Sequence, residues 1–175
     1  MSAQSSPHKL AREDPGAAHR LRMCALAIGE APALSVCELE LDRPAPSYTV
    51  DTLRAIHASH PDAELTFILG ADTACTLASW REPAAILELA RLAVAARSGS
   101  PRGRVREVVA SLLDANTRRA QQRISFLEMP ALEVSSSAVR ARVARGQPVA
   151  ELVGVAVAGY IASHGLYRAA SGVVS

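Results

Sequence analysis

Several stretches of the chain place hydroxyl groups and an arginine where a helix is expected to begin. The first is Val134–Arg140, VSSSAVR, in which Ser136 and Ser137 lie where a loop turns into a helix and Arg140 falls in the first turn. A helix start offers unpaired backbone N–H groups and the positive end of the helix dipole, which bind anions. Arginine adds a charged fork that fits phosphate oxygens. The stretch would suit a triphosphate, although taken alone it is more typical of N-capping by serine beside a solvated arginine.

A second hydroxyl-rich helix start lies at Ser47–Thr52, with the sequence SYTVDT. Thr49 is the expected cap, and Pro61 is expected to stop the helix near His60. The same unpaired N–H groups make this start a second candidate anion site. Ordinary capping is again the simpler interpretation when the stretch is considered in isolation.

The run Phe67–Asp72, FILGAD, joins a short apolar strand to a glycine and a carboxylate. Continuous apolar residues are typical of a strand buried on both faces. Gly70 would let a ligand approach the backbone closely. Asp72 would lie at the mouth of the sheet and could accept hydrogen bonds from ribose hydroxyls; capping of the next helix is an equally good interpretation.

Trp80 and Lys9 are each the only residue of their type. Polar neighbours at 78–83 predict a partly exposed indole that could stack on a planar ring, with packing at a helix joint as the alternative. Lys9 follows His8, and this basic pair could neutralise phosphate oxygens. Composition alone favours a disordered tail for the pair.

No residue pattern predicts a metal site. His57 and His60 have a spacing that can bind metal on a helix, but no third ligand lies close in sequence, so a solvated helix end is the better interpretation. The three cysteines lack metal or redox spacing and are expected to be small buried residues in a reducing compartment. Arginines at 102–106 and 118–123 are interpreted as a solvated face, with an interaction surface as the alternative.

These motifs need elements that bring them to one edge of a sheet. Alternating or continuous apolar residues predict strands at 34–41, 65–69, 92–96 and 124–129. Helical spacing, with Pro and Gly as punctuation, predicts helices at 14–29, 49–60, 83–90, 104–118, 137–145 and 149–161. The alternation favours an α/β fold: a Rossmann-like parallel sheet with helices on both faces, and ligands beyond the carboxyl ends of the strands.

Length and composition fit one domain over residues 1–175, with 1–6 and 169–175 expected to be disordered. Apolar residues make up 49% and aromatic residues 3%, which suits a core of small aliphatic side chains. The net charge of +2 argues against a nucleic-acid partner. No apolar run reaches the roughly 20 residues of a membrane span, and no signal region precedes Lys9. We therefore expect a cytoplasmic protein with no membrane partner.

Each motif is unspecific alone, but their order is specific. From Pro7 to Arg168 the chain resembles the bacterial nicotinate-nucleotide adenylyltransferase family of the nucleotidyltransferase superfamily. The resemblance rests on Pro7–Lys9, Arg20–Met23, Ser47–Leu53, Phe67–Asp72, Trp80, Arg97–Gly99, Val134–Arg140 and the tail Tyr160–Tyr167. It implies a nucleotidyltransferase fold and adenylyl transfer from ATP to nicotinate mononucleotide in NAD biosynthesis, assisted by Mg²⁺ that accompanies ATP. Formation of a homo-oligomer is possible, and the sequence does not decide it.

The resemblance also implies a role for each matching residue. ATP is implied to bind at Gly70, Asp72, Arg97, Ser136, Ser137 and Arg140. Nicotinate mononucleotide is implied to bind at His8, Lys9, Ser47, Tyr48, Thr49, Trp80 and Arg81. The implied catalytic residues are Lys9 and Arg140. Because the mononucleotide phosphate attacks the α-phosphorus directly, their task is to neutralise phosphate charge.

The chain departs from the family at its beginning. The family opens with a strand and a loop of pattern G-x-F-D-P-x-H-x-G-H, which no stretch here matches, so the fold is expected to lack that strand and histidine loop. We expect a truncated N-terminus, with about 30–40 residues missing. Those histidines stabilise the transferring phosphate in relatives, so the activity of the chain as it stands is open. There are three smaller departures. This chain has Arg81 where relatives often have an aromatic residue, and it has Ser98 and Gly154 where the family usually has proline.

Two other functions stay compatible with the sequence. One is another adenylyl or cytidylyl transferase of the superfamily, which the combination of Trp80 with Ser47–Thr49 argues against. The other is a non-catalytic nucleotide-binding protein, which the missing histidine loop favours.

Overall fold

The computed structural model describes residues 14–41, 43–44, 46–96, 99–113, 117–130 and 134–168. The chain divides into two compact units: unit 1 comprises residues 1–47 and 133–175, and unit 2 comprises residues 48–132. The sequence predicted a single domain over residues 1–175, and this stays a prediction, because a domain can contain two compact units. The tails expected to be disordered, 1–6 and 169–175, lie outside the described residues.

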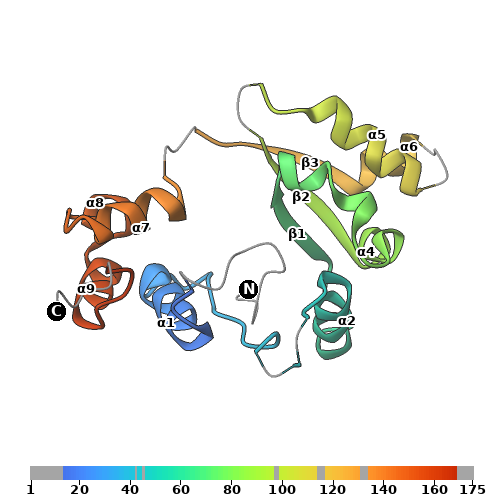
Figure 1. The fold of residues 1–175 in the computed structure, drawn as a ribbon. Coiled ribbons are helices and arrows are strands. Elements are labelled where there is room, and N and C mark those ends of the chain that lie inside the picture. The colour runs from blue at the N-terminus through green and yellow to red at the C-terminus, as the bar shows by residue number, and fades with distance from the viewer. Residues whose placement is uncertain are drawn as a thin grey trace. The chain divides into compact units, whose positions relative to one another are not determined.

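Unit 2 is built on a parallel three-stranded sheet with the order β1-β2-β3 (Figure 1). The strands are β1 (Leu65–Gly70), β2 (Ala90–Ala96) and β3 (Ile124–Glu128). The register pairs Leu65 with Ala90 and Leu92 with Ile124. The short apolar runs therefore form the strands predicted for them, and the parallel α/β sheet is confirmed.

The helices of unit 2 are α2 (Thr49–Ser59), α3 (Ala71–Ala74), the 3-10 turn η2 (Leu77–Ser79), α4 (Pro83–Leu89), α5 (Arg102–Leu112) and α6 (Thr117–Arg123). The strands follow one another across the sheet in one direction, so right-handed crossovers place α4 and α5 on the same face. One hydrophobic core lies between this face and the helices, with Leu77, Leu87 and Leu92 fully buried in it.

The opposite face of the sheet carries exposed apolar side chains. Ile68 on β1 is 64% exposed and Leu127 on β3 is 40% exposed. The prediction that 65–69 is buried on both faces is therefore wrong. The reason is that the helices of unit 2 pack against the face that bears Phe67 and Leu69.

Unit 1 is helical over much of its described length, with α1 (Ala17–Ile28), α7 (Ser136–Ala144), α8 (Ala150–Val153) and α9 (Val155–Ser163). Helices α1 and α9 contact each other, and Met23 packs with Val157 and Ile161 in a small core. His19 Nδ1 on α1 lies 2.9 Å from the Tyr160 hydroxyl on α9. Within the described ranges, no helix of either unit combines the length and the apolar character of a membrane span.

Residues 34–41, predicted to be a strand, form turns and irregular backbone, so that prediction is wrong. Leu34 is 59% exposed, and the Leu41 N–H donates to the Glu38 carbonyl at 2.7 Å in a turn. An alternating pattern specifies a strand only when a neighbouring strand accepts its backbone hydrogen bonds. The sheet found among the described residues consists of β1, β2 and β3.

The bounds of α1, α5 and the α8–α9 pair differ from prediction for local reasons. Helix α1 begins after Asp14, because the Asp14 carboxylate accepts a hydrogen bond from the Gly16 N–H in a turn that precedes the helix. The helix predicted over 149–161 is two helices, because Gly154 has a φ of 82°. Helix α5 ends at Leu112, and the arginines expected beyond it belong to α6.

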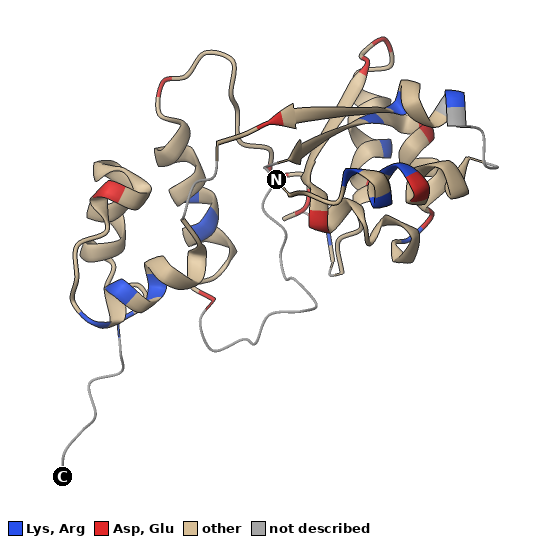
Figure 2. Cartoon of the chain, turned by 90° about the horizontal axis from the view of Figure 1, so that it is seen from above, with Lys and Arg blue, Asp and Glu red and all other residues tan. Residues whose placement is uncertain are grey.

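Acidic and basic residues are interspersed on the helices of unit 2 (Figure 2). Arg102 on α5 pairs with Glu128 on β3. The guanidinium carbons of Arg102 and Arg106 lie 5.3 and 4.8 Å from the centroid of the Phe126 ring. This arginine group, interpreted from the sequence as a solvated face, therefore also shields an aromatic side chain of β3 by cation–π contact.

Candidate functional site

The carboxyl end of β1 leads directly into a short helix and exposes a carboxylate. A Cβ atom built on Gly70 would meet nothing within 4 Å, so the backbone there faces open space. Asp72 lies in the first turn of α3 and is exposed. Gly70 is the N-cap residue and α3 has no side-chain cap hydrogen bond, so Asp72 does not cap the helix. The strand end thus combines an approachable backbone with a solvent-facing carboxylate.

Helix α2 begins at Thr49, and Tyr48, not the predicted Thr49, is its N-cap residue. The Tyr48 side chain makes no cap hydrogen bond, and the backbone N–H groups of Asp51 and Thr52 reach the Tyr48 carbonyl at 3.1 and 3.2 Å. Ser47 Oγ is buried and has no hydrogen-bond partner among the described residues. Hydroxyl capping by the N-cap residue therefore does not explain this helix start, and its role as an anion site stays a prediction.

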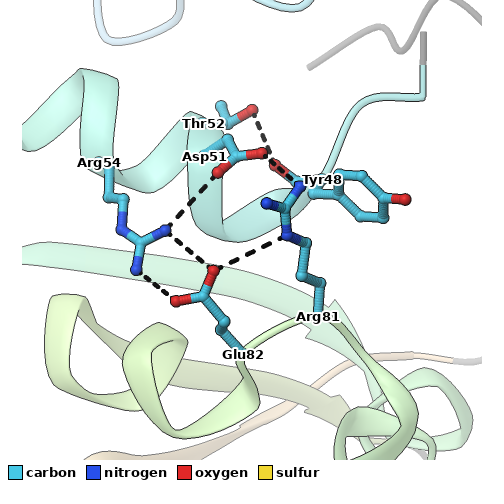
Figure 3. A network of polar contacts seen from close by, with 6 residues as sticks. All are labelled: Tyr48, Asp51, Thr52, Arg54, Arg81 and Glu82. Carbon is cyan, nitrogen blue, oxygen red and sulfur yellow. Dashed lines mark hydrogen bonds and ion pairs between the residues drawn. The ribbon is translucent and has the colours of Figure 1, made fainter.

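Side chains from α2 and from the loop before α4 meet in a charged network (Figure 3). The Arg81 guanidinium carbon lies 4.7 Å from the Tyr48 ring centroid, a cation–π arrangement. Arg81 Nη1 lies 3.4 Å from Asp51 Oδ2, and its Nε lies 3.7 Å from Glu82 Oε1. The Arg54 guanidinium donates to both Glu82 carboxylate oxygens at 3.1 and 2.6 Å and lies 3.7 Å from Asp51 Oδ1. Alternating charges therefore hold together two segments that are distant in sequence.

Arg54 and Glu82, the central pair of this network, both stay charged over a wider pH range than the isolated side chains would. The hydrogen bond from Arg54 lowers the pKa of the Glu82 carboxyl below its ordinary 4.5, against the opposing effect of burial. The same hydrogen bond raises the pKa of Arg54. The side chains are 47% and 44% exposed, so solvent screens the attraction, and the pair contributes more to geometry than to stability.

Trp80 lies next to this network and is half-buried, as predicted. Its Nε1 donates to Thr76 Oγ1 at 3.1 Å. Its ring meets the Phe67 ring at a centroid distance of 6.2 Å and an interplanar angle of 66°. Packing at a helix joint therefore accounts for one edge of the indole, while the remaining exposed surface suits stacking on a planar ring.

In unit 1, α7 begins at Ser136 rather than at the predicted Ser137. Ser135 is the N-cap residue, and its Oγ accepts a hydrogen bond from the Ala138 N–H at 3.1 Å. Arg140 Nη2 donates to Ser137 Oγ at 3.2 Å. Serine capping is thus real, but Ser135 performs it. Ser136 and Ser137 are left exposed at a helix start beside a guanidinium.

The predicted site residues are divided between the two units. Unit 2 contains Tyr48, Thr49, Gly70, Asp72, Trp80 and Arg81, and unit 1 contains Ser47, Ser136, Ser137 and Arg140. His8, Lys9 and Arg97 lie outside the described residues, as does Ser98. In the part of the chain that the structure describes, no group of three or more His, Cys, Asp or Glu side chains is placed to hold a metal ion.

Sequence reasoning missed Asp51, Arg54 and Glu82. Asp51 and Arg54 stand at i and i+3 on α2, a spacing at which an ion pair is expected. Glu82 gave no such signal, because its main partner lies on another helix and the contact exists only in the folded chain.

Comparison with known proteins assigns the family. A model of the cytidylyltransferase-like family matches residues 1–142. A probable nicotinate-nucleotide adenylyltransferase from Thermomicrobium roseum is 38% identical over 168 residues, covering 96% of this chain and 76% of that relative. Another from Bordetella petrii is 42% identical over 164 residues, covering 94% of this chain and 80% of the relative. The chain belongs to the nicotinate-nucleotide adenylyltransferase family. It is therefore an enzyme of the nucleotidyltransferase class.

Solved structures share the fold of this family member. Plasmodium falciparum nicotinic acid mononucleotide adenylyltransferase complexed with NaAD matches with a TM-score of 0.61 and 19% identity, over 94% of this chain and 78% of that chain. The same enzyme complexed with APC matches with a TM-score of 0.59 and 19% identity, over 87% and 76%. The predicted Rossmann-like nucleotidyltransferase fold is therefore confirmed.

Proposed function

We propose that the chain transfers the AMP part of ATP to nicotinate mononucleotide, giving nicotinate adenine dinucleotide and pyrophosphate in NAD biosynthesis. Membership of the nicotinate-nucleotide adenylyltransferase family supports the reaction class. A protein of the same fold that is complexed with NaAD supports a dinucleotide of this type.

The observation that carries the proposal is the meeting of the α2 start with the loop at 80–82. Arg81 lies over Tyr48, so the loop that bears the half-buried Trp80 lies beside a helix start whose N-cap residue makes no side-chain cap hydrogen bond. A carboxylate is stabilised near a helix N-terminus, and a pyridine ring can stack on an exposed indole. The two features together favour an aromatic acid over the corresponding amide.

The remaining predicted residues take the roles that the family resemblance implies. Gly70 and Asp72 would meet the adenosine, with Asp72 on its ribose. Ser136, Ser137 and Arg140 at the α7 start would hold the ATP phosphates. The role of Lys9 and His8 on phosphate, and of Arg97 at the adenine or phosphate edge, stays a prediction.

The proposed reaction requires the protein to position the two substrates and to neutralise the charge on their phosphates. A phosphate oxygen of the mononucleotide attacks the α-phosphorus of ATP, the bond from that phosphorus to the bridging oxygen breaks, and pyrophosphate leaves with the electron pair. No covalent enzyme intermediate is needed, so Ser136, Ser137 and Arg140 would orient the phosphates and neutralise their charge. Magnesium, when bound with ATP, supplies further neutralisation of the phosphates. Because no group of three or more His, Cys, Asp or Glu side chains in the described part of the chain is placed to hold a metal ion, magnesium would enter the site with ATP.

Pyrophosphate release tests the proposal when it is measured with three acceptors: nicotinate mononucleotide, nicotinamide mononucleotide and phosphopantetheine. We expect release with the first, and release about tenfold slower with the amide because it lacks the charge that a helix start attracts. Release with phosphopantetheine alone would assign the chain to another transferase of the superfamily. Calorimetric binding of ATP and nicotinate mononucleotide without release would assign a non-catalytic binding function.

A further inference from the structure

Glu82 has a backbone conformation that is unusual for a residue with a side chain. Its φ of 47° and ψ of 57° lie in the left-handed region. Residues other than glycine persist there only when their surroundings hold them. Glu82 occupies the N-cap position of α4 directly before Pro83, yet α4 has no side-chain cap hydrogen bond. Helix capping therefore does not explain why a glutamate stands here.

The Glu82 side chain is held from α2 instead. Arg54 donates to both carboxylate oxygens, at 3.1 and 2.6 Å, and such a two-point contact fixes direction as well as distance. Arg81 Nε lies 3.7 Å from Glu82 Oε1 on the loop side. The carboxylate thus bridges a guanidinium of α2 and a guanidinium of the loop (Figure 3).

We propose that Glu82 is a positioning residue for the pyridine side of the site: gripped by Arg54, it fixes the turn that carries Trp80 and Arg81 against the start of α2. The inference rests on the proposed function, because it concerns the placement of the side chains assigned there to nicotinate mononucleotide. A change in the Glu82 turn moves the indole of Trp80, two residues earlier in the loop, and the Arg81 guanidinium that lies over Tyr48. Substrate affinity on this side should therefore depend on a carboxylate that does not touch the substrate.

Trp80 is the only tryptophan in the chain, so its emission reports on the site without requiring turnover. The experiment titrates the full chain with nicotinate mononucleotide and follows the quenching of Trp80 emission in the wild type and in three variants. Glu82→Gln keeps the size of the side chain and removes its charge. Arg54→Gln removes the partner. Glu82→Gly removes the tether but relieves the backbone, because glycine adopts this φ without steric cost.

We expect the dissociation constant of nicotinate mononucleotide to rise about fivefold to tenfold in each variant, since misplacement of a binding group weakens every contact it makes. The double variant with both glutamines should bind no more weakly than either single one, because the two residues act as a unit. Glu88→Gln is the matched control: Glu88 is an exposed glutamate on the same helix, and its variant should bind as the wild type does.

The outcomes separate the inference from the proposed function. Wild-type emission that does not respond to saturating nicotinate mononucleotide would refute the proposed pyridine site, and the inference would fall with it. A responsive wild type with Glu82→Gly binding equally well would refute the positioning role alone, because the backbone conformation would then suffice. Additive effects of the two glutamine substitutions would also refute it. Glu82→Gly keeps the test decisive if Glu82→Gln does not fold.

Discussion

The indole of Trp80 is partly packed against the protein and partly exposed. Its ring edge meets Phe67, and its Nε1 bonds Thr76 Oγ1, while part of the ring faces solvent. We predict that Trp80→Ala raises the KM for nicotinate mononucleotide about threefold to tenfold, because an aromatic stack contributes about 0.5–1.5 kcal/mol. The KM for ATP should change little. Steady-state kinetics with each substrate varied in turn measures both constants.

Trp80→Phe is the control for this prediction. It keeps an aromatic face and loses the hydrogen bond to Thr76, so it should retain most of the affinity for the mononucleotide. If Trp80→Ala raised the KM for ATP and left that for the mononucleotide unchanged, the indole would belong to the adenosine side and the assignment would be wrong.

Glu82 makes the stability of the folded chain depend on pH in the acid range. Its pKa is lowered, so the folded chain keeps the carboxylate to more acid pH than the unfolded chain does. The contribution of the Arg54–Glu82 pair is therefore present above the ordinary pKa of 4.5 and is lost as pH falls through the lowered value. We predict that Glu82→Gln melts below the wild type at neutral pH and that the two melting temperatures converge well below pH 4.5. A thermal-melt series against pH measures this, and a gap that stayed constant down to acid pH would contradict it.

At the scale of elements, Gly154 separates α8 from α9 with a φ of 82° and a ψ of 156°. An L side chain is strained there, and the proline usual in the family needs a φ of about −65°. We predict that Gly154→Ala destabilises the chain by about 1–3 kcal/mol, measured by denaturant unfolding. Gly159 in α9 is the matched control: a Cβ there meets nothing within 4 Å, so Gly159→Ala should stabilise by about 0.5–1 kcal/mol. Equal effects of the two alanines would show that the α8–α9 joint does not depend on the glycine.

The start of α7 separates a structural serine from its neighbours. Ser135 accepts the Ala138 N–H as N-cap, whereas Ser136 is exposed and is assigned to phosphate. We predict that Ser135→Ala costs about 1 kcal/mol of stability, while Ser136→Ala leaves the unfolding free energy unchanged and raises the KM for ATP. Thermal melts and ATP kinetics on both variants measure this contrast. A Ser136→Ala variant with wild-type ATP kinetics would remove that residue from the phosphate site.

The elements that the sequence predicted well are those whose pattern is local. The runs at 65–69 and 92–96 became strands because mostly apolar residues suit a sheet under a layer of helices, and the alternating run at 124–129 became the strand beside them. The run at 34–41 alternates equally well but is not a strand, because a strand also requires a partner that its own sequence does not encode. Gly154 divided a helix whose apolar spacing continues on both sides of it.

At the scale of the whole molecule, the order of short motifs along the chain was sufficient to predict the family and the fold. Their side-chain contacts were not predictable in the same way. The Arg54–Glu82 pair joins residues 28 apart in sequence, and neither residue belongs to a motif used for the resemblance. Tertiary ion pairs of this kind follow from how α2 and α4 pack, which no local spacing specifies.

The proposed function requires the α2 start and the half-buried Trp80 indole in unit 2 to select together the acid form of a pyridine mononucleotide. Titration of Trp80 emission with nicotinate mononucleotide and with nicotinamide mononucleotide tests this most directly. We predict saturable quenching by both, with the acid binding about threefold to thirtyfold more tightly because its carboxylate meets the α2 dipole. Equal affinity for acid and amide, or an emission that neither nucleotide changes, would contradict the account.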